Sequence, residues 1–280
     1  MDKQEFDTFF KPYSQNVDAA NGLAFWKLSD ALIHAIIQKH IPTSLSADTT
    51  ILDAGGGTGR WITELSHVYA CRFVLFDLSE DMLGKAQTNF ASAQLQDRTS
   101  MIHGSLTDMY AVADRSIDHI VSIYSPLSFI EETDRVAVEL HRILKPGGVV
   151  LVMGHGYYNA LASKINNSTA PAPELERLNA DMRVKWASHV PELSTFSKER
   201  METTFTQAGF AAVATYGVPV FVQPGPEDFN PSNTEHSRIS RALENPEFFE
   251  TVFRIEMEHN AKPEVANRGM NIFSVFQKAL

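Results

Sequence analysis

The sequence lacks the features that define several classes of protein. Its 280 residues include one cysteine, Cys71, which excludes an intramolecular disulfide and a cysteine-cluster metal site and which we expect to be a buried apolar residue. No stretch approaches the roughly 18 consecutive apolar residues of a membrane span, and residues 1–15 have no apolar segment typical of a secretory signal. We therefore expect a cytoplasmic protein that does not bind membranes.

Positive charge is also scarce. The formal net charge is -10, and no dense run of lysine and arginine is interleaved with aromatic residues. Proteins that bind nucleic acids usually carry such a basic patch, so we do not expect a nucleic acid as partner. The hydrophobic fraction of 44% is enough for a full core, either in one large α/β domain or in one domain with a smaller appendage.

Apolar runs typical of strands alternate with helical patterns along most of the chain. An amphipathic helix is expected within 18–39. Strands are expected at 50–52, 73–76, 101–103, 117–124, 149–153, 211–216 and 272–277. Helices are expected at 60–68, 80–91, 132–144 and 198–210. This alternation predicts an α/β fold with a doubly wound, mainly parallel seven-stranded sheet and helices on both faces.

A glycine cluster, "LDAGGGTGRW", follows the first of these strands. Such a cluster indicates a tight turn or a backbone that a ligand approaches closely. Its spacing is D-x-G-x-G-x-G, and Arg60 stands where the third glycine of a dinucleotide-binding G-x-G-x-x-G motif would be. The Lys-Ser/Thr pair of a nucleotide-binding P-loop is also missing, which leaves a ligand of another kind.

Three motifs together resemble those of the class I S-adenosylmethionine-dependent methyltransferases. They are the glycine cluster, "VLFDLSEDML" at 74–83 and "RILKPGGVVLVM" at 142–153, and "FSKERMETTFTQAGF" extends the resemblance beyond about 45–155. The resemblance implies a Rossmann-like fold with S-adenosyl-L-methionine as cofactor and S-adenosyl-L-homocysteine as product.

The resemblance also assigns the residues that hold the cofactor. Gly55 and Gly57 would present bare backbone to its amino-acid end, and Asp53 would attract its ammonium directly or through water. Asp77, at the end of the second strand, would accept hydrogen bonds from both ribose hydroxyls. The alternative for Asp77 is to cap the next helix, a role for which Ser79 is better placed.

The contacts to the adenine ring are less closely defined. Leu78 and Met82 would offer it apolar surface, or they would be part of the core. Ser105 stands where the family often has Asp or Asn to contact the adenine amino group, with Leu106 beside it. Asp108 is a competing candidate for the same contact.

The methyl group is expected at the carboxyl ends of the strands, at the switch point between the first and fourth strands. That position places Tyr124 beside the methyl. The sequence "SIYSPLSF" lacks the motif used on planar amines, which disfavours base or glutamine N-methylation, and it offers no carboxylate for a metal, so we expect no metal ion. His155, flanked by two glycines, is a second catalytic candidate because an imidazole with a pKa near 6.5 suits a general base. Its alternative role is a hydrogen bond within a cap.

Two long segments, 156–194 and 222–267, do not fit the alternation of strands and helices, and long segments of this kind often cover binding sites. The expected organisation is N-terminal helices and the cofactor-binding half at 1–155, a cap at 156–194, a return to the core sheet at 195–221, a second cap at 222–267 and the last core strand at 268–280. Aromatic residues in or near the caps would contact the acceptor or be ordinary packing: Tyr13, Trp26, Tyr157, Tyr158 and Trp186.

The predicted function is in-line transfer of a methyl group to a hydroxyl, amine or carbon of a small-molecule acceptor in a capped pocket. Three alternatives stay open: a non-catalytic S-adenosylmethionine-binding protein, a protein methyltransferase with an open groove, and an NAD-type oxidoreductase. The sequence leaves the acceptor and the oligomeric state open.

Overall fold

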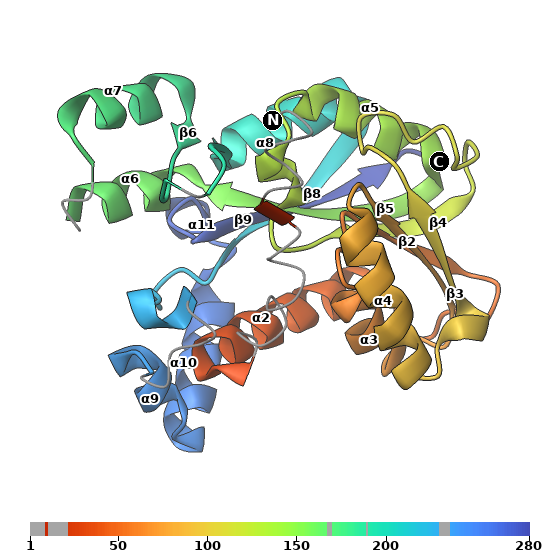
Figure 1. Ribbon diagram of the computed structural model, residues 1–280, viewed down its shortest axis with the longest axis horizontal. Helices are drawn as coiled ribbons and strands as arrows, with labels where there is room; N and C mark the ends of the chain where they lie inside the picture. Colours follow the sequence, from red (N-terminus) through yellow and green to blue (C-terminus); the bar gives the residue numbers. More distant parts are fainter. Residues whose placement is uncertain (1–8, 11–21, 167–169, 189, 230–235) are drawn as a thin grey trace.

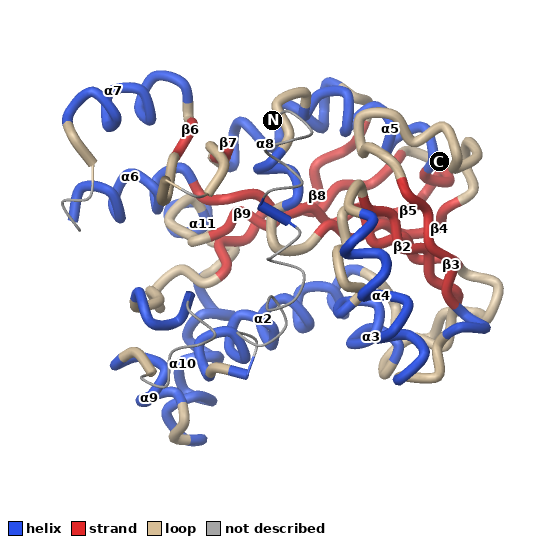
Figure 2. Tube along the Cα trace, viewed as in Figure 1, coloured by secondary structure: helices blue, strands red, loops and turns tan. Residues whose placement is uncertain are grey.

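A twisted central sheet with helices on both faces forms the centre of the computed structural model, which describes residues 9–10, 22–166, 170–188, 190–229 and 236–280 (Figures 1 and 2). The described strands that build its main part are β1 (Thr50–Ala54), β2 (Arg72–Asp77), β3 (Thr99–His103), β4 (Ile117–Ser122), β5 (Leu144–Gly156), β8 (Phe210–Val218) and β9 (Asn271–Lys278).

These strands lie in the order β3-β2-β1-β4-β5-β9-β8. The first five are parallel to one another, whereas β9 runs antiparallel to both β5 and β8. The mainly parallel, doubly wound fold expected from the sequence is confirmed. The order of the strands reverses between β1 and β4, and in such sheets ligands bind at the carboxyl ends of the strands at this point.

Two apolar clusters attach helices to the two faces of the sheet. One joins the sheet to α2 (Ala24–His40), α3 (Arg60–Ser66) and α4 (Glu80–Ser92). The other joins it to α5 (Thr133–Ile143) and α8 (Lys198–Gln207). Both faces of the sheet are therefore buried, as the long apolar strands require.

The first inserted segment contains α6 (Tyr157–Asn166), α7 (Ala172–Asp181) and the short strands β6 (Arg183–Val184) and β7 (Leu193–Phe196). Its apolar residues form a small cluster separate from the two main ones. Strand β7 runs parallel to the end of β5, where His155 pairs with Thr195 on one side and with Asn271 of β9 on the other. The segment thus extends the sheet beyond the point where β4 ends.

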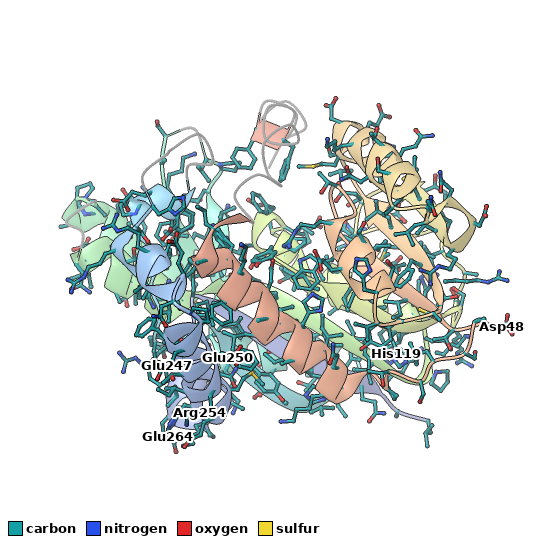
Figure 3. The ribbon with its side chains drawn as sticks, turned by 90° about the horizontal axis from the view of Figure 1, so that it is seen from below. Asp48, His119, Glu247, Glu250, Arg254 and Glu264 are labelled. Carbon is teal, nitrogen blue, oxygen red and sulfur yellow. The ribbon has the colours of Figure 1, made fainter. Side chains whose placement is uncertain are left out.

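The second inserted segment contains α9 (Arg238–Leu243), α10 (Pro246–His259) and α11 (Pro263–Ala266). Apolar residues of α10, among them Phe249 and Phe253, pack against the cluster that includes α2. Figure 3 shows α2 crossing this face of the sheet, with α10 beside one of its ends. The described part of the chain contains no helix that is long and apolar enough to cross a membrane.

Candidate active site

The glycine loop between β1 and α3 has the geometry that its sequence requires. Gly55 and Gly57 have φ angles of +75° and +58°, which side-chain-bearing residues rarely adopt. A Cβ atom at Gly55 would lie 2.6 Å from Pro126 Cβ, whereas one at Gly57 would meet nothing closer than Met82 Sδ at 3.8 Å. The loop is therefore tightly packed at Gly55 and open to a ligand at Gly57.

Asp53 is buried in β1 beneath this loop. Its exposed fraction is 1%, and neither carboxyl oxygen has a hydrogen-bond partner among the described residues. A Cβ atom at Gly56 would lie 2.3 Å from Asp53 Oδ2, so the carboxyl group lies directly against the loop. Burial, and then the nearby charge of Asp77, raise the pKa of Asp53 to about 7. A buried polar group without a partner is costly, and an ammonium group or a water molecule would satisfy this one.

Asp77 ends β2 and contacts the glycine loop from the other side. Its Oδ2 accepts a hydrogen bond from Gly57 N at 2.8 Å, and its Oδ1 accepts one from Ser79 N at 2.8 Å. Ser79 is the N-cap of α4, with its Oγ accepting from Met82 N, so Asp77 does not take the capping role. Each oxygen of Asp77 keeps a lone pair for a further donor.

The residues predicted to contact adenine surround the same loop. Leu78 is 45% exposed, while Met82 and Leu106 are buried against the loop. The hydroxyl groups of Ser105 and Thr107 hydrogen-bond to each other at 2.8 Å. Leu78 is therefore the most accessible apolar side chain of this group.

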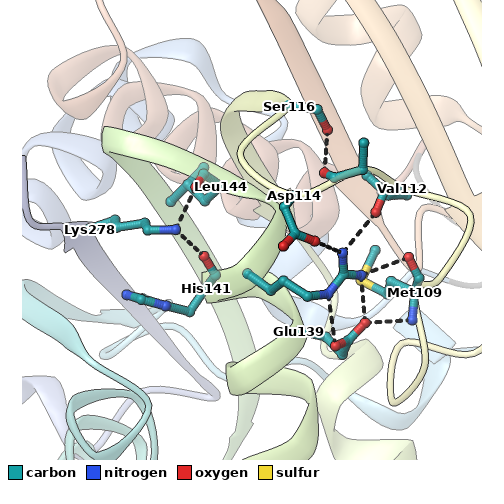
Figure 4. A network of polar contacts seen from close by, with 10 residues as sticks. Met109, Val112, Asp114, Ser116, Glu139, His141, Leu144 and Lys278 are labelled. Carbon is teal, nitrogen blue, oxygen red and sulfur yellow. Dashed lines mark hydrogen bonds and ion pairs between the residues drawn. The ribbon is translucent and has the colours of Figure 1, made fainter.

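A polar network centred on α5 holds the loop after β3, which carries Ser105 and Leu106 (Figure 4). The guanidinium of Arg142, on α5, donates to the carbonyl oxygens of Met109 and Val112, each at 2.9 Å. It also pairs with Glu139 at 2.8 Å and Asp114 at 2.6 Å. Arg142 thereby fixes the loop after β3 to α5. None of these contacts of Arg142 involves the glycine loop.

The chain bends sharply where β4 ends. Tyr124 and Ser125 have φ angles of +58° and +67°, a conformation that costs a non-glycine residue about 1–2 kcal/mol. Side-chain contacts hold the bend from two sides. The Tyr124 hydroxyl donates a short hydrogen bond to Asp30 Oδ1 on α2, and Ser125 Oγ donates to Asn271 Oδ1 at 3.0 Å.

Asp30 also pairs with Arg60, the residue that follows the glycine loop. The two guanidinium nitrogens of Arg60 lie 2.7 and 3.2 Å from the two carboxylate oxygens of Asp30. The guanidinium is 5.1 Å from the Trp61 ring centroid and 5.3 Å from that of Tyr124. One carboxylate thus connects α2 to both the glycine loop and the end of β4.

The sequence reasoning missed this contact of Asp30 and considered Arg60 only as an exception to a dinucleotide motif. The signal was the four-residue spacing of Trp26, Asp30 and His34, which places these residues on one face of α2. Trp26, predicted to contact the acceptor, lies edge-on to Tyr124 at 5.7 Å, and its indole donates to the carbonyl oxygen of Asp228 at 2.7 Å.

His155 lies one residue before the end of β5, which continues past the apolar run 149–153. Its backbone N–H donates to Ser128 Oγ at 2.9 Å, and its ring is 6.5 Å from the Trp186 ring. Burial lowers the pKa of His155 to about 4, below the reference value near 6.5 on which its choice as a catalytic candidate rests. The imidazole is neutral at pH 7 and can accept a proton, but it is a weaker base than a free imidazole.

The other predicted aromatic residues belong to the first inserted segment or lie outside the described part. Tyr157 donates to Asn179 Oδ1 at 3.0 Å and packs edge-on against Tyr158, which is exposed. Trp186 lies 5.8 Å from the ammonium of Lys164. Tyr13 lies outside the described residues. The structure therefore brings Tyr157, Tyr158 and Trp186 to the side of His155, and Trp26 to the side of Tyr124.

A cavity of about 260 Å³ lies beside Ser128, the residue whose hydroxyl accepts from the backbone of His155. It is lined by Ser128, Phe129, Ile130, Glu131, Arg183, Glu192 and Ser194. The short helix η3 (Pro126–Phe129) borders the cavity at its end, while Pro126 at its start packs on Gly55. The glycine loop and the cavity are therefore at opposite ends of one helical turn.

Two other kinds of site can be assessed in the described residues. A second depression, of about 450 Å³, is lined by α10 residues such as Phe253 and Arg254, and none of the predicted site residues lines it. No group of three or more His, Cys, Asp or Glu side chains within the described ranges is arranged to hold a metal ion.

Comparison with known proteins finds methyltransferases that resemble part of this chain. Residues 51–148 match the family described as "Methyltransferase domain". A tRNA 5-carboxymethoxyuridine methyltransferase of Escherichia coli (strain K12) is 24% identical over 61% of this chain and 62% of its own length. A demethylmenaquinone methyltransferase of Staphylococcus epidermidis is 26% identical over 54% of this chain and 60% of its own length. The matches thus span about three fifths of these curated relatives.

Solved structures give the same fold. Phosphoethanolamine N-methyltransferase 2 of Haemonchus contortus, solved with S-adenosyl-L-methionine, superimposes with a TM-score of 0.60 over 97% of this chain and 60% of its own, at 16% identity. The comparisons therefore support a class I S-adenosylmethionine-dependent methyltransferase, with the family match confined to residues 51–148.

Proposed function

We propose that the protein binds S-adenosyl-L-methionine and transfers its methyl group to a small-molecule acceptor. The observation that carries the proposal is the pair of carboxylates beside the glycine loop. Asp53 is buried without a hydrogen-bond partner among the described residues, and Asp77 is held on the loop by Gly57 N with lone pairs to spare. An ammonium and a ribose diol are the groups that such a pair would satisfy.

The residues present fit each part of the cofactor. Asp53 attracts the ammonium, and Asp77 accepts hydrogen bonds from the ribose hydroxyls. Leu78, Met82 and Leu106 offer apolar surface to the adenine, with Ser105 near its amino group. When bound, the cofactor supplies a methyl group on a positively charged sulfur, which is electrophilic without further activation.

The acceptor enters from the cavity beyond η3, which Arg183, Glu192 and Ser194 of the first inserted segment help to line. The neutral imidazole of His155, whose backbone is bonded to Ser128 in the cavity wall, takes the proton that a hydroxyl or ammonium acceptor releases. The curated relatives named above act on a tRNA nucleoside and on a quinone precursor. The net charge of -10 and the lack of a basic run favour a small molecule over tRNA here.

Calorimetric titration with S-adenosyl-L-methionine, S-adenosyl-L-homocysteine and NAD tests the cofactor. We expect the two sulfur compounds to bind and NAD not to bind. Replacing Asp77 with alanine removes two charge-assisted hydrogen bonds and should weaken cofactor binding about ten- to a thousandfold. Asp81→Ala, in the exposed first turn of α4, is the matched control. Unchanged affinity in a folded Asp77→Ala protein would contradict this assignment.

Transfer itself is tested with cofactor labelled in its methyl group and pools of hydroxyl-, amine- and carbon-acceptor metabolites. We expect the label to appear in a small molecule in a protein-dependent way. Cofactor binding without any transfer would support the non-catalytic alternative, and label in added tRNA or protein would exclude a small-molecule acceptor.

A further inference from the structure

We propose that Asp30 is a positioning residue that fixes Tyr124 so that this tyrosine contributes its ring, and not a proton, to the methyl-transfer site. The inference rests on the proposed function and extends it to two residues on different elements. Asp30 lies on α2, outside every motif that defines the family resemblance, and acts through Tyr124.

The position of Tyr124 follows from the strand pairing. Val121 of β4 pairs with Asp53 of β1, so Tyr124 follows three residues after the neighbour of the buried carboxylate. The next residues begin η3, whose Pro126 packs on Gly55. Tyr124 therefore lies at the switch point of the sheet, beside the loop where the charged sulfur of the cofactor would be held.

Asp30 uses both of its oxygens to hold this region. Oδ1 accepts from the Tyr124 hydroxyl and from Arg60 Nη2, and Oδ2 accepts from Arg60 Nη1 at 2.7 Å. The side chains of Asp30 and Arg60 are 18% and 17% exposed, so solvent screens their bidentate ion pair only partly. Since Arg60 is the first residue of α3, Asp30 fixes Tyr124 relative to the glycine loop itself.

The same contact occupies the tyrosine hydroxyl. Burial, and then the negative charge of Asp30, hold the pKa of Tyr124 well above its usual range. The phenol therefore stays protonated and donates a hydrogen bond to Asp30, so its oxygen is not available as a general base. What Tyr124 offers a ligand is its ring, packed edge-on against Trp26 at 5.7 Å.

An aromatic ring attracts a positive charge, so its effect should differ between cofactor and product. S-Adenosyl-L-methionine carries a positive sulfur, and S-adenosyl-L-homocysteine carries a neutral one. A cation–π contact is worth roughly a threefold to thirtyfold change in affinity. Loss of the positioned ring should thus weaken binding of S-adenosyl-L-methionine more than binding of S-adenosyl-L-homocysteine.

Calorimetry with both compounds tests this on the full chain. We expect Asp30→Ala and Tyr124→Leu each to weaken S-adenosyl-L-methionine binding about tenfold and S-adenosyl-L-homocysteine binding less than threefold. The double variant should lose less than the sum of the two single losses, because both single variants remove the contact between Asp30 and Tyr124. Asp30→Asn keeps an oxygen for the tyrosine hydroxyl and should restore part of the preference. Asp118→Asn, which breaks an ion pair with Lys145 away from the glycine loop, is the matched control.

Ionisation of the tyrosine provides a second measurement that a purely structural role for Asp30 would not change. The ionisation of Tyr124 is followed by tyrosinate absorbance over pH, and the Asp30→Asn/Tyr124→Phe protein gives the signal of the other tyrosines. We expect Tyr124 to ionise at a lower pH in the Asp30→Asn protein than in the parent protein. If Asp30→Ala does not fold, Asp30→Asn carries both measurements, and Tyr124→Phe, which has no hydroxyl to ionise, carries the binding measurement alone.

The outcomes separate the two levels of the proposal. A parent protein that binds neither sulfur compound overturns the proposed function. A parent protein that binds both, with Asp30 variants that lose both equally or lose neither, overturns only the positioning role. An unshifted tyrosine ionisation would likewise contradict it.

Discussion

At the scale of single residues, the buried carboxyl of Asp53 makes stability depend on pH. Its pKa of about 7 in the folded protein lies above the value of 3.8 expected when the chain is unfolded. A raised folded pKa contributes stability at low pH, and this contribution is lost as the pH rises from about 4 through about 7. The whole effect is at most about 4 kcal/mol.

Asp53→Asn removes this charge and keeps the shape of the side chain. We expect the melting temperature of the variant, relative to the parent, to be higher at pH 8 than at pH 5, by about 2 °C or more for each kcal/mol relieved. Thermal unfolding of both ligand-free proteins at the two pH values measures this. An equal difference at pH 5 and pH 8 would mean that folding does not raise the pKa of Asp53.

His155 allows a prediction about catalysis. If its neutral imidazole accepts the proton of the acceptor, His155→Ala should lower kcat on the order of a hundredfold and leave cofactor affinity nearly unchanged. The acidic limb of the pH–rate profile, expected near the lowered pKa of about 4, should disappear in the variant. Steady-state kinetics over pH with the acceptor found by methyl labelling makes the measurement. Near-normal kcat with an intact acidic limb would remove His155 from the reaction.

Which site residues the sequence could reveal depended on how far apart the interacting residues are in the chain. Asp53, Gly55 and Gly57 lie in one turn, so their spacing alone indicated their arrangement. The contact between Tyr124 and Asp30 joins positions 94 residues apart, and the spacing that places Asp30 on one face of α2 does not show which residue it contacts. The lowered pKa of His155 also follows from burial by distant segments.

At the scale of elements, the strands were predictable because buried parallel strands are continuous apolar runs. β5 begins at Leu144, five residues before the expected strand at 149, because Leu144 already pairs with Ile117 of β4. The short strands β6 and β7 were not predicted. Strand β7 pairs with β5 and β6 pairs with β7, and both pairings depend on tertiary contacts.

The two inserted segments should respond to ligand as separate units. The first has a small apolar cluster of its own, and a region with few buried contacts opens at lower free energy than the core. We expect amide hydrogen exchange in α6 and α7 to be faster than in β1 and β4, and exchange in 156–194 and 222–267 to slow when cofactor and acceptor bind. Mass-spectrometric exchange measures this. Equally slow exchange with and without ligands would contradict the role of these segments as mobile caps.

At the scale of the whole molecule, α2 links parts that the sequence presents as unrelated. It packs on the sheet, contacts α9 and α10 of the second inserted segment, and holds the end of β4 through Asp30. The alternation of strands and helices predicts the sheet but not this arrangement, because amphipathicity shows that a helix has a buried face without showing what covers it.

The place of β9 in the sheet governs when the protein can fold during its synthesis. Residues 149–155 of β5 and the whole of β8 find their neighbour in 271–278, which leaves the ribosome after every other described strand. Until then β5 presents a free apolar edge, and β8 has no partner among the described strands. Such edges pair readily with other chains, so the nascent protein is exposed to aggregation until its last strand arrives and joins the two parts of the sheet.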